Sequence, residues 1–266
     1  MKQLFFLLFG ILVILLQTAC QSKIDKQLDM PLSLAGDNRK EMEKILDHYK
    51  NDPEKLAAAR FLIMNMPGHS GVNQSNIEKL QPFYLKYVDI SKQHNWKRSS
   101  EWQKEIDSLW RNEKTKIHPS LFNKKADIQT INADWLINEI DRSFNAWKEN
   151  VYTQSDTFDD FCKYILPYRF AEGICLDESR DTFYKRHARI FNDINKDFRV
   201  VTDSLHQIYS DLMHNNWAAA SMPICNAGTF EQIKRGSCDD KAWYNCLMMS
   251  ALGMGVAIDF VPEWGN

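Results

Sequence analysis

The chain has 266 residues, of which 44% are hydrophobic and 12% aromatic, and its formal net charge at pH 7 is −2. That apolar content is typical of a folded globular protein and excludes an intrinsically disordered chain, which has few aromatic residues. The nearly balanced charge argues against a nucleic-acid-binding surface, because such a surface needs an excess of lysine and arginine. We therefore expect a globular protein without a nucleic-acid partner.

The first twenty residues have the pattern of a secretory leader. Lys2 supplies a positive charge, and the apolar run from Leu4 to Leu16 is shorter than a bilayer-spanning helix needs. The phrase Gln17-Thr18-Ala19-Cys20 follows, and it resembles the cleavage site of a bacterial lipoprotein signal. The resemblance implies a signal peptide over residues 1–19, acyl chains on Cys20, and a lipoprotein anchored in the membrane of the bacterial cell envelope, on the periplasmic side or the cell surface. An ordinary cleaved signal peptide is the alternative.

The next two stretches differ in composition. Residues 20–37 are mostly polar, which predicts a tether between the membrane and the folded body. Residues 38–215 carry apolar side chains at helical spacing, which predicts a largely helical region. Asp52 before Pro53 and, further on, Asn132 are expected to cap two of its helices.

Two later helices of this region have less definite beginnings. Ser155 or Asp156 can cap a helix that Pro167 stops. A longer helical pattern runs from Asp181 to Met213 and is expected to break in its middle.

Beyond the helical region, residues 216–266 mix helix and strand signals. The phrase Asn226-Ala227-Gly228 predicts a turn, and a compact helix is expected from Cys238 to Leu252, ended by Gly253. The apolar run Val256–Val261 is typical of a buried strand. We therefore expect a second domain, of the α+β class, over these residues.

The start of that compact helix carries the clearest chemistry in the chain. Ser237 is expected to cap the helix, with Asp240 completing a capping box. Cys238 then lies in the first turn, where unpaired backbone N–H groups and the helix dipole stabilise a thiolate. Gly236 would let a substrate backbone approach closely, whereas the charge of Asp239 opposes a thiolate. A packed, unreactive cysteine is the alternative.

The helix also has a regular stripe of small and apolar residues. We expect this stripe to anchor the helix while the sulfur lies at its exposed end; its members are Cys238, Ala242, Cys246 and Met249.

The cysteines other than Cys20 are odd in number, which permits at most two disulfides and a leftover thiol; they are Cys162, Cys175, Cys225, Cys238 and Cys246. The sequence does not choose between core thiols and disulfide partners for Cys162, Cys175 and Cys225.

The C-terminal phrases resemble the core of the transglutaminase-like family, within the papain-like cysteine enzymes. They are Gly236-Ser237-Cys238, the helix end Ala251-Leu252-Gly253, and the run Val256–Pro262. The resemblance implies that Cys238 is the nucleophile of a Cys-His-Asp triad that attacks peptide or protein amides and forms an acyl-enzyme. Three phrases of the helical region, Phe61–His69, Asn132–Ile137 and Phe158–Arg169, are similar to the region that precedes this domain in lipoproteins of Bacteroides-like bacteria.

The chain departs from the family pattern in two ways. Ser250 and Gly255 stand where the family phrase R-A-L-G-I-P has Arg and Pro. No residue matches the family His or Asp, so we expect an incomplete domain that is inactive unless a longer chain supplies both. His69, His206 and His214 are interpreted as structural or surface residues, and Asp259 as a strand residue.

Together these patterns predict an α+β protein: a largely helical N-terminal region followed by the first part, helix plus strand, of a transglutaminase-like domain. The expected function is that of a lipid-anchored cysteine hydrolase or acyltransferase without a cofactor. The chain contains neither a CxxC pair nor two histidines at i, i+4, so the sequence does not predict a metal site. The alternative function is a non-catalytic, lipid-anchored binding protein with a degenerate transglutaminase-like domain. Residues that bind the substrate are not assigned.

Overall fold

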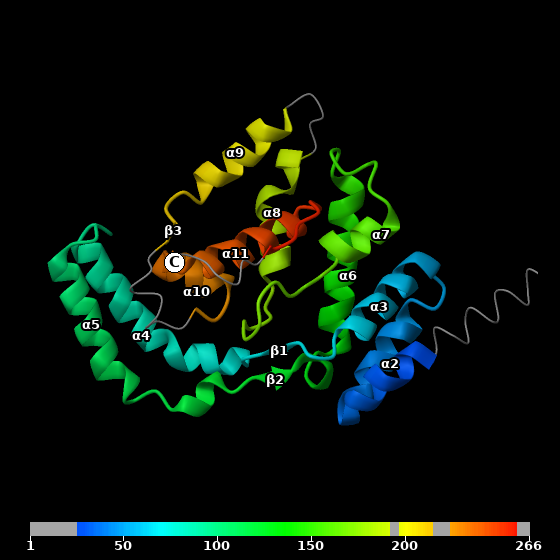
Figure 1. Cartoon of the computed structure of the whole chain (residues 1–266), viewed down its shortest axis with the longest axis horizontal. Coiled ribbons are helices and arrows are strands. Elements are labelled where there is room, and N and C mark those ends of the chain that lie inside the picture. The colour runs from blue at the N-terminus through cyan, green and yellow to red at the C-terminus, as the bar shows by residue number, and fades with distance from the viewer. Residues whose placement is uncertain (1–25, 192–196, 215–223, 260–266) are drawn as a thin grey trace, which may run out of the picture. The chain divides into compact units, whose positions relative to one another are not determined.

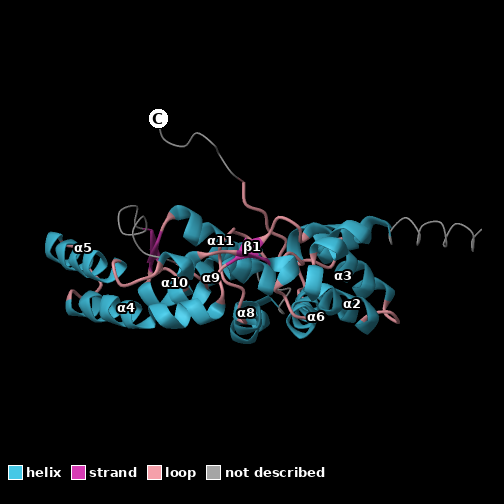
Figure 2. Ribbon diagram, turned by 90° about the horizontal axis from the view of Figure 1, so that it is seen from below, coloured by secondary structure: helices cyan, strands magenta, loops and turns pink. Residues whose placement is uncertain are grey.

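The computed structural model describes residues 26–191, 197–214 and 224–259 (Figure 1). These residues are mostly helical, and the strands among them are short, as the colouring of Figure 2 shows. The helix-rich character that the sequence predicts is therefore confirmed. Cys20 and the expected signal peptide lie outside the described residues. Across the described ranges, no helix combines the length and the apolar character needed to cross a membrane.

The chain divides into two compact units. The first comprises Met1–Gly68 with Asp127–Leu136, and the second His69–Ala126 with Ile137–Asn266. The boundary expected near Asn215 does not coincide with this division, since residues on both sides of it belong to the second unit. One hydrophobic cluster joins Phe183, before that boundary, to Tyr244 after it, and shared burial of this kind makes a single unit.

The first unit begins with helical residues where a tether was expected. Residues 26–34 are helical, and Leu28, Leu32 and Ala35 are buried. The prediction of a tether over residues 20–37 is wrong for this part. These three residues recur at i, i+4 and i+7, so the helix has an apolar side to bury despite its polar composition.

The rest of the first unit follows the sequence prediction. It contains η1 (Gly36–Asn38), α2 (Arg39–His48), α3 (Pro53–Asn65), η3 (Asp127–Gln129) and the first turn of α6 (Ala133–Glu149). Asp52 caps α3 by accepting a 3.1 Å hydrogen bond from the Lys55 amide. Asn132 accepts one of 2.8 Å from the Trp135 amide at the start of α6. Both capping predictions are confirmed.

The second unit opens with two short strands and a helical hairpin. The strands β1 (Ser70–Gly71) and β2 (Lys125–Ala126) pair antiparallel, and between them lie α4 (Gln74–Gln93), α5 (Ser100–Lys114) and η2 (Pro119–Phe122). The helix α4 continues through Pro82, a residue that usually interrupts a helix.

The second half of α6 leads to a helical turn that buries aromatic rings. This turn is α7 (Phe158–Asp160), followed by the π-helical segment η4 (Phe161–Ile165). Its cap is Thr157, not Ser155 or Asp156, because Thr157 and Asp160 form a complete capping box. Phe161 stacks on Trp147 of α6 with ring centroids 4.5 Å apart.

The last part of the second unit alternates helices with two short strands. Its elements are α8 (Ser179–His187), η5 (Ala188–Phe191), α9 (Phe198–Ile208), β3 (Met213–His214), α10 (Ala227–Ile233), β4 (Arg235–Gly236) and α11 (Cys238–Ala251). The break expected within the long helical pattern is present, and Asp197 caps α9. Asn226 does not begin a turn. It caps α10, accepting a 2.8 Å hydrogen bond from the Thr229 amide.

The strand predicted over Val256–Val261 is wrong for residues 256–259, which have no regular secondary structure; the residues from 260 on lie outside the described part. A strand needs a paired neighbour, and no described strand lies alongside this segment. The Val256 amide instead donates to the Tyr164 carbonyl at 3.1 Å, and Ile258 is exposed. Asp259 is therefore an exposed residue of an irregular segment.

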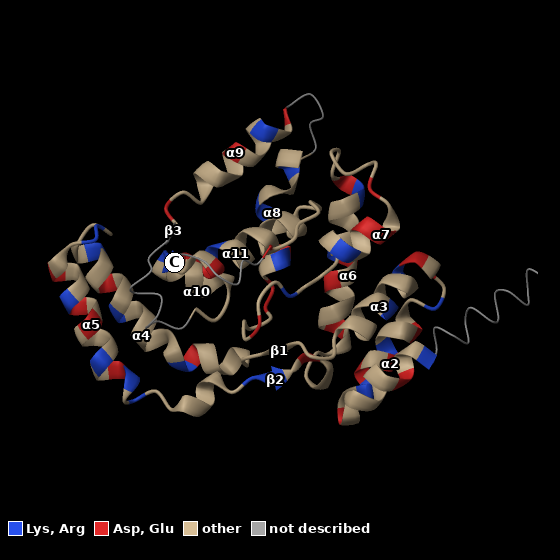
Figure 3. Cartoon of the chain, in the orientation of Figure 1, with Lys and Arg blue, Asp and Glu red and all other residues tan. Residues whose placement is uncertain are grey.

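Charges of both signs are interspersed along the helices (Figure 3). On α5, for example, Glu113 accepts hydrogen bonds from Lys86 at 2.7 Å and from Lys116 at 3.1 Å. Exposed pairs of this kind contribute little to stability.

Candidate functional site

Cys238 is the first residue of α11, as the sequence predicts. The Ser237 hydroxyl accepts a 3.1 Å hydrogen bond from the Asp240 amide, and the Asp240 carboxylate accepts one of 2.7 Å from the Ser237 amide. Both halves of the capping box are present, so the prediction of the cap is confirmed. The sulfur is thus attached to the first turn of a fourteen-residue helix, at its positive end.

The Cys238 side chain is exposed, unlike Cys162, Cys175 and Cys225, which are buried. Its sulfur lies 3.9 Å from Asp239 Oδ1, at the long limit of a hydrogen bond in which the thiol is the donor. Within the described residues, no imidazole is hydrogen-bonded to this sulfur. The structure therefore places an accessible thiol beside a carboxylate.

The predicted anchoring face of α11 is not the buried one. The buried side chains are Trp243, Tyr244, Met248, Ser250 and Ala251, whereas Ala242, Cys246 and Met249 are half-buried. Because each helical residue advances by about 100°, these buried residues lie roughly opposite the stripe that contains Cys238. The stripe combines small residues with a methionine, while the true core face carries the two aromatic rings.

Gly236 has a packing role instead of the predicted substrate contact. It is buried, and an added Cβ would lie 2.8 Å from the Asp240 Cβ and 2.8 Å from the Phe230 ring. The backbone of β4 also pairs in parallel with β3, with His214 opposite Gly236. A substrate has no access to this glycine. The pairing brings the backbone of His214 beside the segment that leads to Cys238, which the sequence separation does not suggest.

Arg235, just before Gly236, ties this segment to the α4–α5 hairpin. Its Nη2 donates to the Trp96 carbonyl at 2.5 Å, and its guanidinium lies 5.3 Å from the Trp102 ring centroid. Arg235 is buried. Sequence patterns did not predict this role of Arg235, whose one local signal is its position next to a conformationally permissive glycine.

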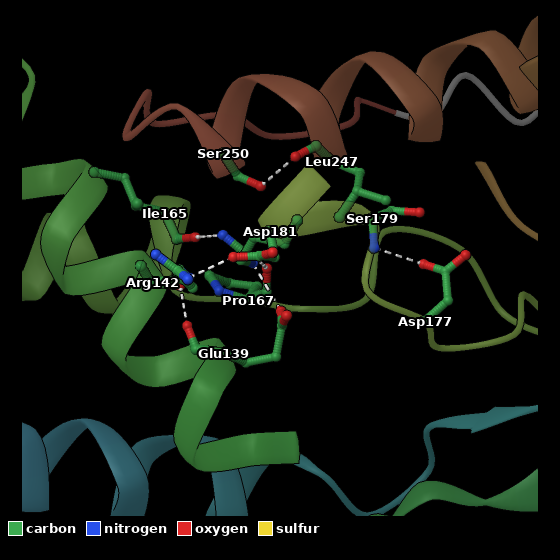
Figure 4. Close-up of polar contacts among 11 residues, drawn as sticks. Glu139, Arg142, Ile165, Pro167, Asp177, Ser179, Asp181, Leu247 and Ser250 are labelled. Atoms are coloured by element: carbon green, nitrogen blue, oxygen red, sulfur yellow. Dashed lines mark hydrogen bonds and ion pairs between the residues drawn. The ribbon is translucent and has the colours of Figure 1, made fainter. Parts of the chain in front are cut away.

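A buried ion pair supports α8, the helix that packs against α11. Arg180 Nε donates to Glu139 Oε2 at 2.8 Å, and its other nitrogens donate to the carbonyls of Ile165 at 3.2 Å and Pro167 at 2.6 Å (Figure 4). Burial raises the pKa of Glu139 to about 7, against the opposing effect of Arg180. The sequence carried no signal for this pair, because its partners lie on different helices.

The neighbouring ion pair in Figure 4 is more exposed. Arg142 Nε lies 2.6 Å from Asp181 Oδ1, which links α6 to α8 a second time. In the same view Ser250, on the buried face of α11, donates to the Leu247 carbonyl at 3.0 Å. These contacts tie α6 to α8, and we interpret the cluster as structural support for the helix that packs against α11.

Of the histidines set aside in the sequence analysis, the structure describes the side chains of His69 and His206, whereas the side chain of His214 lies outside the described part. His69 is half-buried, with its ring edge-on to Tyr168 at 6.1 Å, and His206 is exposed on α9. Among residues 26–191, 197–214 and 224–259, no group of three His, Cys, Asp or Glu side chains could hold a metal ion.

Comparison with known proteins gives no relative, since neither a family model nor a curated protein nor a solved structure matches the chain.

Proposed function

We propose that this chain is a lipid-anchored, transglutaminase-like cysteine enzyme that acts on peptide or protein amides. The observation that supports the proposal is the exposed thiol of Cys238 in the first turn of the capped helix α11. Free backbone N–H groups and the helix dipole at this place favour negative charge on the sulfur. An exposed, charge-stabilised thiolate is the arrangement that cysteine nucleophiles use.

In the proposed reaction, the Cys238 thiolate attacks the amide carbonyl carbon and forms a thioester, and the amine leaves with a proton. Water or another amine then attacks the thioester and restores the thiol, which gives hydrolysis or acyl transfer. In the family a His moves these protons and an Asp orients the His. No residue of this chain is assigned to either role.

The nucleophile is tested by alkylation of the folded full chain with iodoacetamide, followed by peptide mapping. We expect Cys238 to react at least tenfold faster than the same cysteine in a free peptide of sequence 235–241. The peptide is the matched control, since it has the same neighbours and full exposure but no helix. Equal rates for protein and peptide would show that the fold does not activate Cys238, and the enzyme proposal would fall.

A second candidate function is a non-catalytic binding protein with a degenerate domain. The observation that favours it is the Asp239 carboxylate, 3.9 Å from the sulfur, which opposes charge on the thiol. A covalent acyl adduct on Cys238 after incubation of the full chain with activated esters of a mixed peptide library, absent in Cys238→Ala, supports the enzyme. Binding of the same peptides without turnover, unchanged in Cys238→Ala, supports the binding protein.

The lipid anchor belongs to the same proposal and has its own test. Metabolic labelling with a fatty-acid analogue in a bacterial host should label the full chain but not Cys20→Ser. Labelling that survives in Cys20→Ser, or is missing from both chains, contradicts an anchor at this residue.

A further inference from the structure

We propose that Cys175 and Cys225 form a disulfide bond, an inference that does not depend on the proposed enzyme activity. The Cys175 amide donates a hydrogen bond to the Cys225 carbonyl, with a nitrogen–oxygen distance of 2.6 Å. Standard bond lengths from these two atoms to their own Cα atoms then limit the Cα–Cα separation to at most about 6.5 Å. Disulfides span Cα–Cα distances of roughly 4.4–6.8 Å, so the backbone is already close enough.

The two side chains share one environment. Both residues are 4% exposed and belong to the same hydrophobic cluster as Tyr84 and Ile233. Burial, followed by the charges of Asp177 and of Cys225, raises the pKa of Cys175 to about 12. The electrostatic effect of Cys225 on the Cys175 thiol supports the proximity that the backbone hydrogen bond establishes.

Neither thiol makes a strong hydrogen bond that would be lost when a disulfide forms. Cys175 Sγ donates contacts of 3.3 Å to Gln74 Oε1 and to the Leu176 carbonyl, and Cys225 Sγ lies 3.5 Å from the Tyr84 hydroxyl. Thiols are weak donors and acceptors. A change of side-chain torsion at the two cysteines can therefore replace these contacts by a covalent bond.

The remaining cysteines do not offer the same arrangement. Cys238 is exposed and Cys246 is half-buried, while Cys162 is buried within η4. Among the described residues, Cys175 and Cys225 are the one pair of cysteines joined by a backbone hydrogen bond outside the regular elements. The proposed bond leaves Cys238 as a free thiol.

Bond formation is a two-electron oxidation, and its oxidant is a disulfide, either a thiol–disulfide oxidoreductase or oxidised glutathione. One cysteine thiolate attacks the oxidant disulfide, forms a mixed disulfide and releases one thiol. The thiolate of the second cysteine attacks the protein sulfur of that mixed disulfide, which forms the Cys175–Cys225 bond and releases the second thiol. Since both sulfurs are buried, the exchange takes place before the core closes.

The bond would join the segment before α8 to the residue before the α10 cap. Cys225 precedes Asn226, whose side chain caps α10, and Phe230 of α10 packs against Gly236. The covalent link would close a loop that contains α8 and α9 and would fix α10 in place. It therefore supports the backbone that positions Cys238 without touching the thiol.

The test uses the full chain, unfolded and reduced in detergent, then refolded in a buffer of reduced and oxidised glutathione. Free thiols are alkylated under denaturing conditions and the peptides are mapped without reduction. We expect a linked peptide pair containing Cys175 and Cys225, with Cys162, Cys238 and Cys246 alkylated. Alkylated Cys175 and Cys225, or a link from either one to another cysteine, would overturn the proposal.

Thermal unfolding gives a second measurement with a matched control. Reductant should lower the Tm of the refolded wild-type chain by about 10 °C, because the closed loop constrains the unfolded chain. The same loss is expected in Cys162→Ser, which replaces a cysteine that is also 4% exposed, and no loss in Cys175→Ser. A reductant effect that persists in Cys175→Ser contradicts the bond. Should that variant fail to fold, the peptide map of the wild-type chain decides alone.

Discussion

Arg235 donates a hydrogen bond of 2.5 Å to the backbone carbonyl of Trp96, which lies 139 positions earlier in the chain. The guanidinium also lies over the Trp102 ring, and the residue is 4% exposed. A buried cation needs such partners, because it has given up its hydration. The segment that leads into Cys238 is thus attached to the α4–α5 hairpin.

Arg235→Ala should lower the free energy of unfolding by about 3 kcal/mol, because it removes a buried charged hydrogen bond and its packing on the Trp102 ring. Urea denaturation measures this change. Arg98→Ala is the control, since Arg98 is an exposed arginine just after Trp96, and should change stability by less than about 0.5 kcal/mol. Equal losses in the two variants would mean that the Trp96 contact does not stabilise the fold.

The effect of the Ser237 capping box on the reactivity of Cys238 can be distinguished from a general loss of stability. Ser237→Ala and Thr157→Ala should each cost about 1 kcal/mol, because each removes the side-chain half of a complete capping box. Only Ser237→Ala should also slow the alkylation of Cys238, since Thr157 caps a different helix. Alkylation rates and urea midpoints of both variants check this. A slower rate in both would point to general loosening and not to the helix start.

Asp239→Asn should raise the alkylation rate of Cys238 by about threefold at low salt, because it removes a negative charge beside the sulfur. The gain should shrink in 1 M salt, since exposed charges are screened. Asp203→Asn, an exposed residue of α9 with the same charge change, is the control and should leave the rate unchanged. No gain in Asp239→Asn would show that this carboxylate does not restrain the thiol.

Glu139 should make the stability depend on pH. Burial raises its folded pKa to about 7, above the ordinary value of 4.5, so between these values the folded protein keeps a proton that the unfolded chain releases. The free energy of unfolding should therefore fall as the pH rises through this window, by roughly 3 kcal/mol from this group.

Urea denaturation from pH 4.5 to 7.5 checks the dependence. Glu139→Gln cannot titrate and should flatten the profile, whereas Glu43→Gln, which changes an exposed glutamate, should leave it as in the wild type. Parallel profiles for the wild type and Glu139→Gln would contradict the assignment.

Gly253 ends α11 at a position that tolerates no side chain. Its φ is +78°, and an added Cβ would lie 2.2 Å from the Ala146 carbonyl oxygen. Gly253→Ala should cost about 3 kcal/mol or more, from backbone strain and steric overlap together. Gly36→Ala isolates the strain, because Gly36 has a φ of +55° with nothing within 4 Å, and should cost about 1 kcal/mol. Urea denaturation of both variants gives the two costs, and equal costs would contradict the overlap.

The helix beginnings were predictable because their signals are local. Asp52, Asn132 and Ser237 each cap the helix that the sequence assigned to them, and each cap needs only the next few residues. Asn226 was misread as a turn because asparagine and glycine favour turns and caps alike.

The features that the sequence did not predict depend on contacts between residues far apart in the chain. The buried face of α11 is set by the rings of Phe183 and Phe230, which pack on Tyr244. Arg235 and the Glu139–Arg180 pair likewise find their partners elsewhere in the chain. The strand expected from Val256 was predicted from composition alone, whereas a strand forms only where it can pair with a neighbouring strand. At the site, sequence patterns predicted the capped beginning of α11, but not the contacts of Arg235 and Tyr244 that hold the helix in place.

The end of α11 furthest from Cys238 is fixed by a contact of its own. Asn150, just beyond α6, donates a hydrogen bond of 2.9 Å to the Leu252 carbonyl, and Gly253 lies against Ala146. The fourteen residues of the helix form a rod about 21 Å long. Between its two ends the helix is held by the buried rings of Trp243 and Tyr244, so the whole rod is fixed in the core of the second unit. The Asn150 contact therefore helps to set where Cys238 lies along the helix axis, because a rigid rod that is fixed at its end carries its beginning to a definite position.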